Sequence, residues 1–182
     1  LDVSRFVKTL PGVSPRTSFG YNMIVRGGSS NENKFFLDGV EIPAITHFTV
    51  QGTSGGPNGI LNVRMLQGAD LHSGAFPAAR PDALSSVTEV YQREGRRDRW
   101  GGNFTLGATD FGFMAEGPLG KKASIIVSAR ESYSQHMFKA IGLPVLPFYS
   151  DVQLKSVIHF DEKNELTLVG LGGYDRYTLN LE

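Results

Sequence analysis

The chain has 182 residues, enough for one ordinary domain or for a small domain with part of a second. Its 18 basic and 18 acidic residues balance, so the composition gives no sign of a nucleic-acid-binding protein, and the lack of cysteine excludes both a disulfide framework and a thiolate metal site. No apolar run approaches the roughly 18 consecutive residues of a membrane-spanning helix.

Helical spacing occurs at two places in the first part of the chain. In residues 1–12 the apolar side chains recur on one face of a short helix, which we expect to end at Pro11–Gly12. These apolar residues are Val3, Phe6, Val7 and Leu10. Residues 58–66 predict one or two further helical turns, with Asn58 near the cap.

Two apolar runs between these segments predict strands. Residues 21–25 form the first run, which glycines stop, and residues 34–43 form a second strand that we expect to bend at Asp38–Gly39. Residues 87–93 alternate with a period of two, as a strand does. Together with the helical turns, the first hundred or so residues predict a small α+β domain with a modest core.

The pattern changes from Trp100 onward. Period-two runs of about eight to ten residues follow one another, each with an apolar and a polar face, and the polar faces carry Arg130, Lys155 and His159. Two of the turns between the runs are short and polar, whereas residues 131–151 form a long connection. Strands of an outer-membrane barrel show this arrangement, but half-buried strands of a soluble sandwich alternate in the same way.

Four blocks of sequence, taken in order, resemble a TonB-dependent outer-membrane receptor of the Bacteroidetes type. They are "DVSRFVKTLPGV", "IVRGGSSNENKFFLDGVEIP", "LHSGAFPAARPDALSSVTEVYQREG" and "GATDFGFMAEGPLGKK". The resemblance implies an α+β plug domain over residues 1–99, followed over residues 100–182 by antiparallel β-strands of a transmembrane β-barrel. The second part would be an incomplete piece of a 22-stranded barrel.

The chain departs from the family pattern in three respects. The TonB box should lie before residue 1, and most of the barrel should follow residue 182, so we expect a fragment of a longer protein. Arg80 and Pro81 stand where the family often has Tyr-Gly, so we expect the local turn to differ.

The resemblance implies a transporter and not an enzyme. The ligand would be scarce and bulky, such as a siderophore, cobalamin, an oligosaccharide or a peptide, and the plug would gate the barrel in the bacterial outer membrane while staying accessible to the periplasm. The implied partners are TonB, through a segment missing from this chain, the ligand and outer-membrane lipid, with no nucleic acid. The alternatives are an accessory subunit of a larger outer-membrane or secretion assembly, in which a surface lipoprotein is a partner, and a soluble β-rich binding domain.

Arg26 and Asp38 each stand at the end of a strand-like run, directly before glycine. One interpretation is a contact with ligand or with the energising signal. We favour a structural lock, in which the two charges hold the plug strands together or tie the plug to the barrel wall. Glycines at these positions suit tight turns, and a buried charge pair costs about 3–5 kcal/mol to break by removing one partner.

Two loops are the candidate ligand-contacting apices of the plug, and ordinary solvated turns are the alternative. The first is residues 29–33 and the second is residues 43–56. The candidate contacts in them are Asn31, Glu32, Asn33, His47 and Phe48.

No pattern of residues predicts catalysis. A Ser-His-Asp set, paired carboxylates and a phosphate-binding loop are all missing from the sequence, and the four histidines have no metal-ligand spacing. We therefore expect no catalytic residues, no cofactor and no metal.

Overall fold

The computed structural model describes residues 13–17, 21–49, 56, 58–80 and 82–180. The chain divides into two compact units, Leu1–Arg93 and Glu94–Glu182. The helix expected over residues 1–12 lies outside the described residues, and the predicted boundary between residues 99 and 100 stays a prediction. Among the described residues, no helix is long and apolar enough to cross a membrane.

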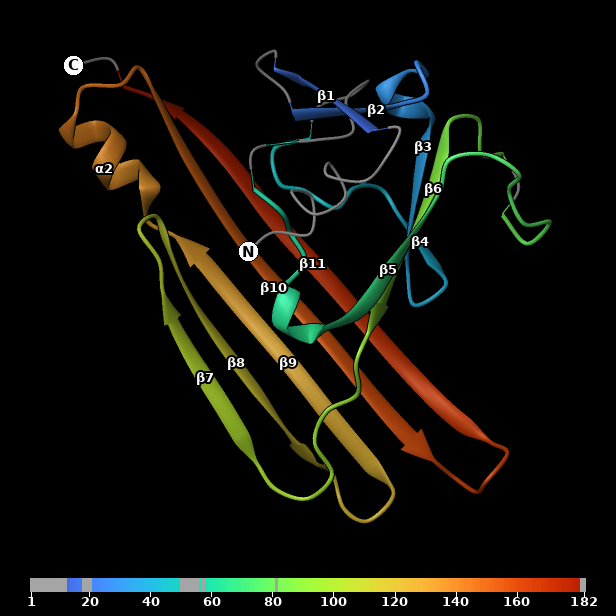
Figure 1. Cartoon of the computed structure of the whole chain (residues 1–182). Helices are drawn as coiled ribbons and strands as arrows, with labels where there is room; N and C mark the ends of the chain where they lie inside the picture. The colour runs from blue at the N-terminus through green and yellow to red at the C-terminus, as the bar shows by residue number, and fades with distance from the viewer. Residues whose placement is uncertain (1–12, 18–20, 50–55, 57, 81, 181–182) are drawn as a thin grey trace. The chain divides into compact units, whose positions relative to one another are not determined.

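The first unit contains a four-stranded mixed sheet with the order β4-β3-β6-β5 (Figure 1). Its strands are β3 (Asn33–Leu37), β4 (Val40–Ile42), β5 (Leu66–His72) and β6 (Ser86–Gln92). β3 pairs with β6 in parallel, whereas the other two pairings are antiparallel. Strands β3 and β6 lie in the middle of the sheet and supply buried apolar side chains, among them Phe35, Leu37, Val87 and Val90.

The single bent strand expected over residues 34–43 is in fact a hairpin of two strands. Asp38 and Gly39 have positive φ angles of 47° and 85°, respectively. Two consecutive residues in the left-handed region form the two-residue turn whose twist matches a β-hairpin. The chain therefore reverses at Asp38–Gly39 and β4 returns along β3, instead of continuing beyond a bend.

Two strands of the first unit, β1 and β5, were not predicted. β1 (Val13–Thr17) pairs with β2 (Tyr21–Val25), and β1 contains Pro15, a residue type that is rare inside strands. β5 has a bulge between Leu66 and Gly68, which interrupts its alternation. The strand predicted for residues 21–25 is confirmed.

The helical turns expected over residues 58–66 are reduced to one 3₁₀ turn, η2 (Val63–Met65). Its cap is Asn62 and not Asn58, because the Asn62 Oδ1 atom accepts a hydrogen bond of 3.0 Å from the Arg64 backbone N–H. A second 3₁₀ turn, η1 (Ser30–Glu32), precedes β3.

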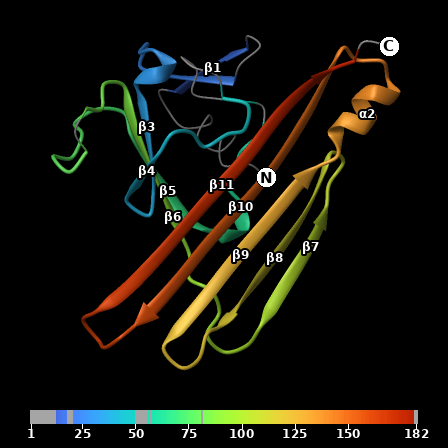
Figure 2. The ribbon, with the colours of Figure 1, turned by 180° about the vertical axis from the view of Figure 1, so that it is seen from behind.

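The second unit is a five-stranded antiparallel meander with the order β11-β10-β9-β8-β7, seen from both sides in Figures 1 and 2. Its strands are β7 (Gly101–Leu106), β8 (Asp110–Pro118), β9 (Ala123–Ser132), β10 (Val145–His159) and β11 (Glu165–Leu179). The predicted antiparallel strands are confirmed, but the last two have 15 residues each, longer than expected. β10 begins inside the expected long connection, which also contains the end of β9 and the short helix α2 (Ser134–Ala140).

The register gives this sheet one apolar and one polar face. Residues directly opposite each other in an antiparallel pair share a face, and Phe104, Phe113, Ala129 and Val152 form one row across four strands. Phe104, Phe113 and Val152 in this row are 64%, 53% and 51% exposed. The other face carries the pair Arg130 and Asp151 and, at every second position along β10, Lys155 and His159. The polar face predicted from the sequence is therefore confirmed.

Candidate functional site

Asp38 joins the β3–β4 turn to the end of β6. Its carboxylate accepts hydrogen bonds from the backbone N–H of Gln92, at 2.8 Å, and from the Gln92 side-chain amide, at 3.0 Å. The Asp38 backbone N–H donates to the Val90 carbonyl over 2.9 Å. The turn is thus tied to the neighbouring strand by three hydrogen bonds, two of them charge-assisted.

Arg26 lies in the turn that follows β2. Its φ angle is 49° and that of Gly27 is 78°, and the Gly28 backbone N–H donates to the Val25 carbonyl over 3.0 Å. The Arg26 Nη1 atom lies 2.8 Å from the point that a Cβ on Gly74 would occupy. Arg26 and Asp38 therefore have different neighbours, and their joint role as a lock stays a prediction.

The first candidate ligand loop is built around η1. The Glu32 carboxylate accepts a 3.0 Å hydrogen bond from the Ser29 backbone N–H, as in a capping box. Asn33 is buried and joins two segments, because its Nδ2 donates to the Met23 carbonyl at 2.8 Å and its Oδ1 accepts from the Ser86 hydroxyl at 2.6 Å. Asn31 is exposed. The ligand role of Asn31, Glu32 and Asn33 stays a prediction.

The second candidate loop holds His47 and Phe48 in its interior, with exposed fractions of 1% and 8%. The His47 backbone N–H donates to the Asn58 carbonyl at 2.7 Å, and the two rings lie 6.2 Å apart. Phe48 has a φ of 57°, which for a bulky residue stores about 1–3 kcal/mol of strain. A Cβ on Gly56 would lie 1.6 Å from the His47 carbonyl oxygen, so the loop closes tightly there. The role of both residues toward ligand stays a prediction.

A charged network that the sequence did not single out lies on the face of β6. The Arg80 guanidinium lies 4.2 Å from the centre of the Phe36 ring, and its Nε lies 2.6 Å from the Glu89 Oε1 atom. The Tyr91 hydroxyl donates to Glu89 Oε2 at 2.6 Å. The Arg80 and Glu89 side chains are only 19% and 13% exposed. Arg80, one of the two residues that depart from the family pattern, therefore holds its loop on the sheet.

The hydroxyl of Tyr91 and then the guanidinium of Arg80 hold the pKa of Glu89 below its ordinary value of 4.5. The same hydrogen bond to Glu89 raises the pKa of Tyr91 to about 12. Because the Glu89 pKa is lowered by folding, its contribution to stability is complete above pH 4.5 and is lost as the pH falls through the lowered value. The contribution of Tyr91 is complete below pH 10 and is lost as the pH rises through about 12.

We expect Arg80→Ala to release the loop over residues 73–84, because it removes the ion pair with Glu89 and the stacking on Phe36, at a cost of about 1–3 kcal/mol. A spin label on Ala79→Cys, an exposed position, reports the loop's mobility. The label should become mobile in Arg80→Ala at neutral pH and in the wild-type sequence only in acid. Arg80→Lys keeps the charge without the planar stacking and should lie between the two. An unchanged label in Arg80→Ala would contradict this account.

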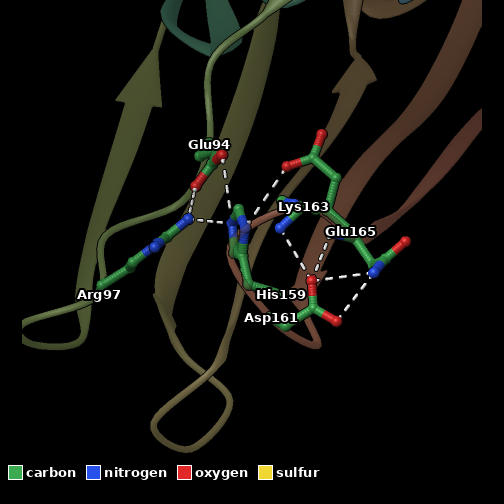
Figure 3. A network of polar contacts seen from close by, with 7 residues as sticks. Glu94, Arg97, His159, Asp161, Lys163 and Glu165 are labelled. Atoms are coloured by element: carbon green, nitrogen blue, oxygen red, sulfur yellow. Dashed lines mark hydrogen bonds and ion pairs between the residues drawn. The ribbon is translucent and has the colours of Figure 1, made fainter.

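A second network occurs at the end of β10 in the other unit (Figure 3). Arg97 contacts Glu94 at 2.5 Å and also His159 Nε2. His159 Nε2 lies 3.6 Å from Glu94 Oε1, and His159 Nδ1 lies 3.4 Å from Glu165 Oε2. The residues come from three places in the sequence, and the pairing of β10 with β11 brings two of them together. Sequence spacing could not have found this group.

Glu94, His159 and Glu165 could offer three ligand atoms within 4.8 Å of one another. Arg97, however, already lies between Glu94 and the imidazole and supplies a positive charge there. The two carboxylates also approach different ring nitrogens, and one metal ion can use only one of them. The geometry therefore favours a network of polar contacts around the Arg97–Glu94 ion pair over a metal centre.

The sequence matches no protein-family model and no curated protein. Its structure is similar to that of the ferric enterobactin receptor PfeA from Pseudomonas aeruginosa. A point mutant of that receptor in complex with enterobactin aligns with a TM-score of 0.69 and 15% identity, over 97% of this chain and 31% of the receptor. A second point mutant gives a TM-score of 0.62 and 16% identity, over 98% and 30% of the two chains. This chain thus spans about a third of these receptors and has the fold of the matching part of a ferric enterobactin receptor.

Proposed function

We propose that this chain is the part of a TonB-dependent outer-membrane receptor that contains the plug domain and the first strands of the barrel. In this proposal residues 1–99 are the plug and residues 100–182 enter the barrel wall. The complete protein takes up a scarce, bulky ligand, and the plug, accessible to the periplasm, gates the barrel. TonB acts through a segment outside this chain.

The observation that carries the proposal is the apolar face of the five-stranded sheet. Phe104, Phe113 and Val152 lie in one row on that face, and each is more than half exposed. A soluble domain rarely exposes a contiguous apolar surface of this kind, whereas the outer wall of a transmembrane barrel requires one. This favours the membrane assignment over a soluble β-rich binding domain.

The proposal also requires more strands than this chain supplies. β7 and β11 are the edges of the sheet, and an unpaired strand edge is too costly in lipid. The remaining strands of the predicted 22-stranded barrel would pair with these two edges. The Bacteroidetes-type origin rests on the sequence blocks alone and stays a prediction.

We take a ferric siderophore as the first ligand class to test, because both solved structures named above are of a ferric enterobactin receptor. Cobalamin, oligosaccharides and peptides are the ligand classes to test next. Outer-membrane lipid would contact the apolar face, and a surface lipoprotein is the partner to look for if no ligand is taken up.

The test is uptake of radiolabelled ligand by cells that carry the complete receptor, with and without a functional TonB. We expect TonB-dependent accumulation, with surface binding preserved when TonB is removed. Accumulation that does not change on loss of TonB would overturn the proposal. Copurification of a lipoprotein in fixed ratio, without uptake of any ligand class, would instead support the accessory-subunit alternative.

A further inference from the structure

We propose that residues 94–100, which we call the anchor segment, fix the start of the second unit to its own sheet against a pull that arrives along the chain from the first unit. The inference rests on the proposed function, in which TonB pulls on the plug. Residues 94–99 are the last residues of the plug in that proposal, but they belong to the second compact unit. It concerns contacts inside the second unit only. These contacts lie on β8, β9 and the β10–β11 hairpin.

The first attachment is the ionic network of Figure 3. Glu94 and Arg97, both in the anchor segment, contact each other at 2.5 Å, and both face His159 at the end of β10. Glu165, the first residue of β11, faces the other ring nitrogen of His159 at 3.4 Å. The imidazole therefore connects the anchor segment to both strands of the hairpin.

The hairpin that carries His159 is itself held in place. In its turn, Asp161 accepts hydrogen bonds of 2.8 Å from the backbone N–H groups of Lys163 and Asn164. These bonds form an Asx-type turn. The His159 backbone N–H donates to the Lys122 carbonyl at 2.8 Å, and the Lys122 ammonium donates to the Phe160 carbonyl at 2.7 Å. The anchor segment thus holds on to a well-bonded end of the sheet.

The second attachment is a close backbone contact with β9. A Cβ placed on Gly95 would lie 2.2 Å from the Ile125 carbonyl oxygen and 2.6 Å from its carbonyl carbon. Only a residue without a Cβ allows the segment to approach the strand so closely. Gly95 is accordingly buried.

The third attachment is to β8. The Arg96 backbone N–H donates to Glu116 Oε2 at 3.2 Å, and the Arg96 Nε lies 3.4 Å from Glu116 Oε1. The Glu116 side chain is 5% exposed, and removing a partner from a buried carboxylate is costly. At the end of the segment, the indole of Trp100 lies against Gly117, where a Cβ would come within 2.3 Å of the ring.

These attachments span four strands, so a force applied at residue 94 loads several contacts at once. Ion pairs and close backbone contacts of this kind must break together before the segment lifts off. The physical consequence is that the start of the second unit resists being lifted off its sheet. Arg97 contacts both Glu94 and His159 and is therefore part of the attachment. Its guanidinium lies where a metal ion joining these two residues would have to lie.

Tryptic cleavage measures how often the anchor segment detaches, because trypsin cleaves after Arg96, Arg97 and Arg99, which all lie in the segment. We would compare tryptic cleavage of the complete receptor with that of the double variant Glu94→Ala/His159→Ala, which keeps all three sites. The matched control is Glu162→Ala, because Glu162 is an exposed carboxylate in the β10–β11 turn and does not flank any of the three cleavage sites in the sequence.

We expect cleavage at these sites to be about tenfold or more faster in the double variant, the change produced by about 1.4 kcal/mol of easier local opening. The control should match the unchanged receptor. Equal rates for the double variant and the control would overturn the anchor. Should the double variant fail to enter the membrane, Glu94→Gln is the milder change, with the same direction expected and the same result contradicting it. Cleavage needs no ligand, so the anchor and the transport function can fail separately.

Discussion

Replacing Asp38 with alanine is expected to loosen the end of β6 by about 3 kcal/mol. The substitution removes two hydrogen bonds to Gln92, at 2.8 and 3.0 Å, each charge-assisted and worth about 1.5–3 kcal/mol. It also places alanine at a φ of 47°, where aspartate is better tolerated, which adds about 1 kcal/mol. Two bonds to the same residue are not additive, so the expected total stays at about 3 kcal/mol although Gln92 is only 1% exposed.

Hydrogen exchange in the complete protein measures this effect. The backbone amide of Gln92 should exchange about a hundredfold faster in Asp38→Ala, since about 1.4 kcal/mol corresponds to a factor of ten. Asp82→Ala is the matched control, because Asp82 also has a positive φ, 62°, but is exposed. It isolates the backbone cost and should change local stability by about 1 kcal/mol. Equal effects at both positions would show that the bonds to Gln92 contribute nothing.

The substitution Asp38→Ala also tests the predicted lock between the plug strands. If Arg26 and Asp38 hold the plug closed, then the double variant Arg26→Ala/Asp38→Ala should let large antibiotics leak through the outer membrane. Asp38 contributes through Gln92 and Arg26 through the segment at Gly74, so the two single variants should have nearly additive effects. Unchanged permeability of the double variant would rule out the lock.

The sequence predicted the second unit better than the first, for a physical reason. In an amphipathic antiparallel sheet every second residue faces the same way, so the alternation of β9 and β10 can be read directly and places Arg130 and Lys155 on one face. In the first unit the elements are short and depend on turns. The hairpin at Asp38–Gly39 depends on two positive φ angles, and β5 contains a bulge.

The two charged networks, around Arg80 and around His159, show a second limit of prediction from sequence. Arg80 and Glu89 are nine residues apart and meet because a loop folds back on β6. Glu94 and His159 meet because the anchor segment lies across the end of the sheet. No local spacing rule covers such pairs, since their proximity follows from tertiary packing. By contrast, Asp38 could be selected from sequence because a charge directly before glycine at the end of a strand marks a turn.

The substitution Gly95→Ala is expected to have the largest effect in the second unit, about 3 kcal/mol or more. The added Cβ would meet the carbonyl group of Ile125 at 2.2 Å, and that group belongs to β9, which pairs with strands on both sides. A flexible side chain could turn away, but the backbone of a central strand cannot, so the anchor segment must move instead. Movement of Gly95 also pulls Arg96 away from Glu116 and Glu94 away from His159.

The matched control is Gly101→Ala in the same unit. There the nearest atom to the added Cβ is 3.6 Å away and belongs to the flexible side chain of Arg96, so no clash arises. With no strain, Gly→Ala reduces the freedom of the unfolded chain and stabilises by about 0.4–1 kcal/mol. We therefore expect the Arg96 amide to exchange about a hundredfold faster in Gly95→Ala and no faster in Gly101→Ala. Similar exchange in both variants would mean that the close approach to Ile125 does not hold the segment, and the anchor would then depend on the ionic network alone.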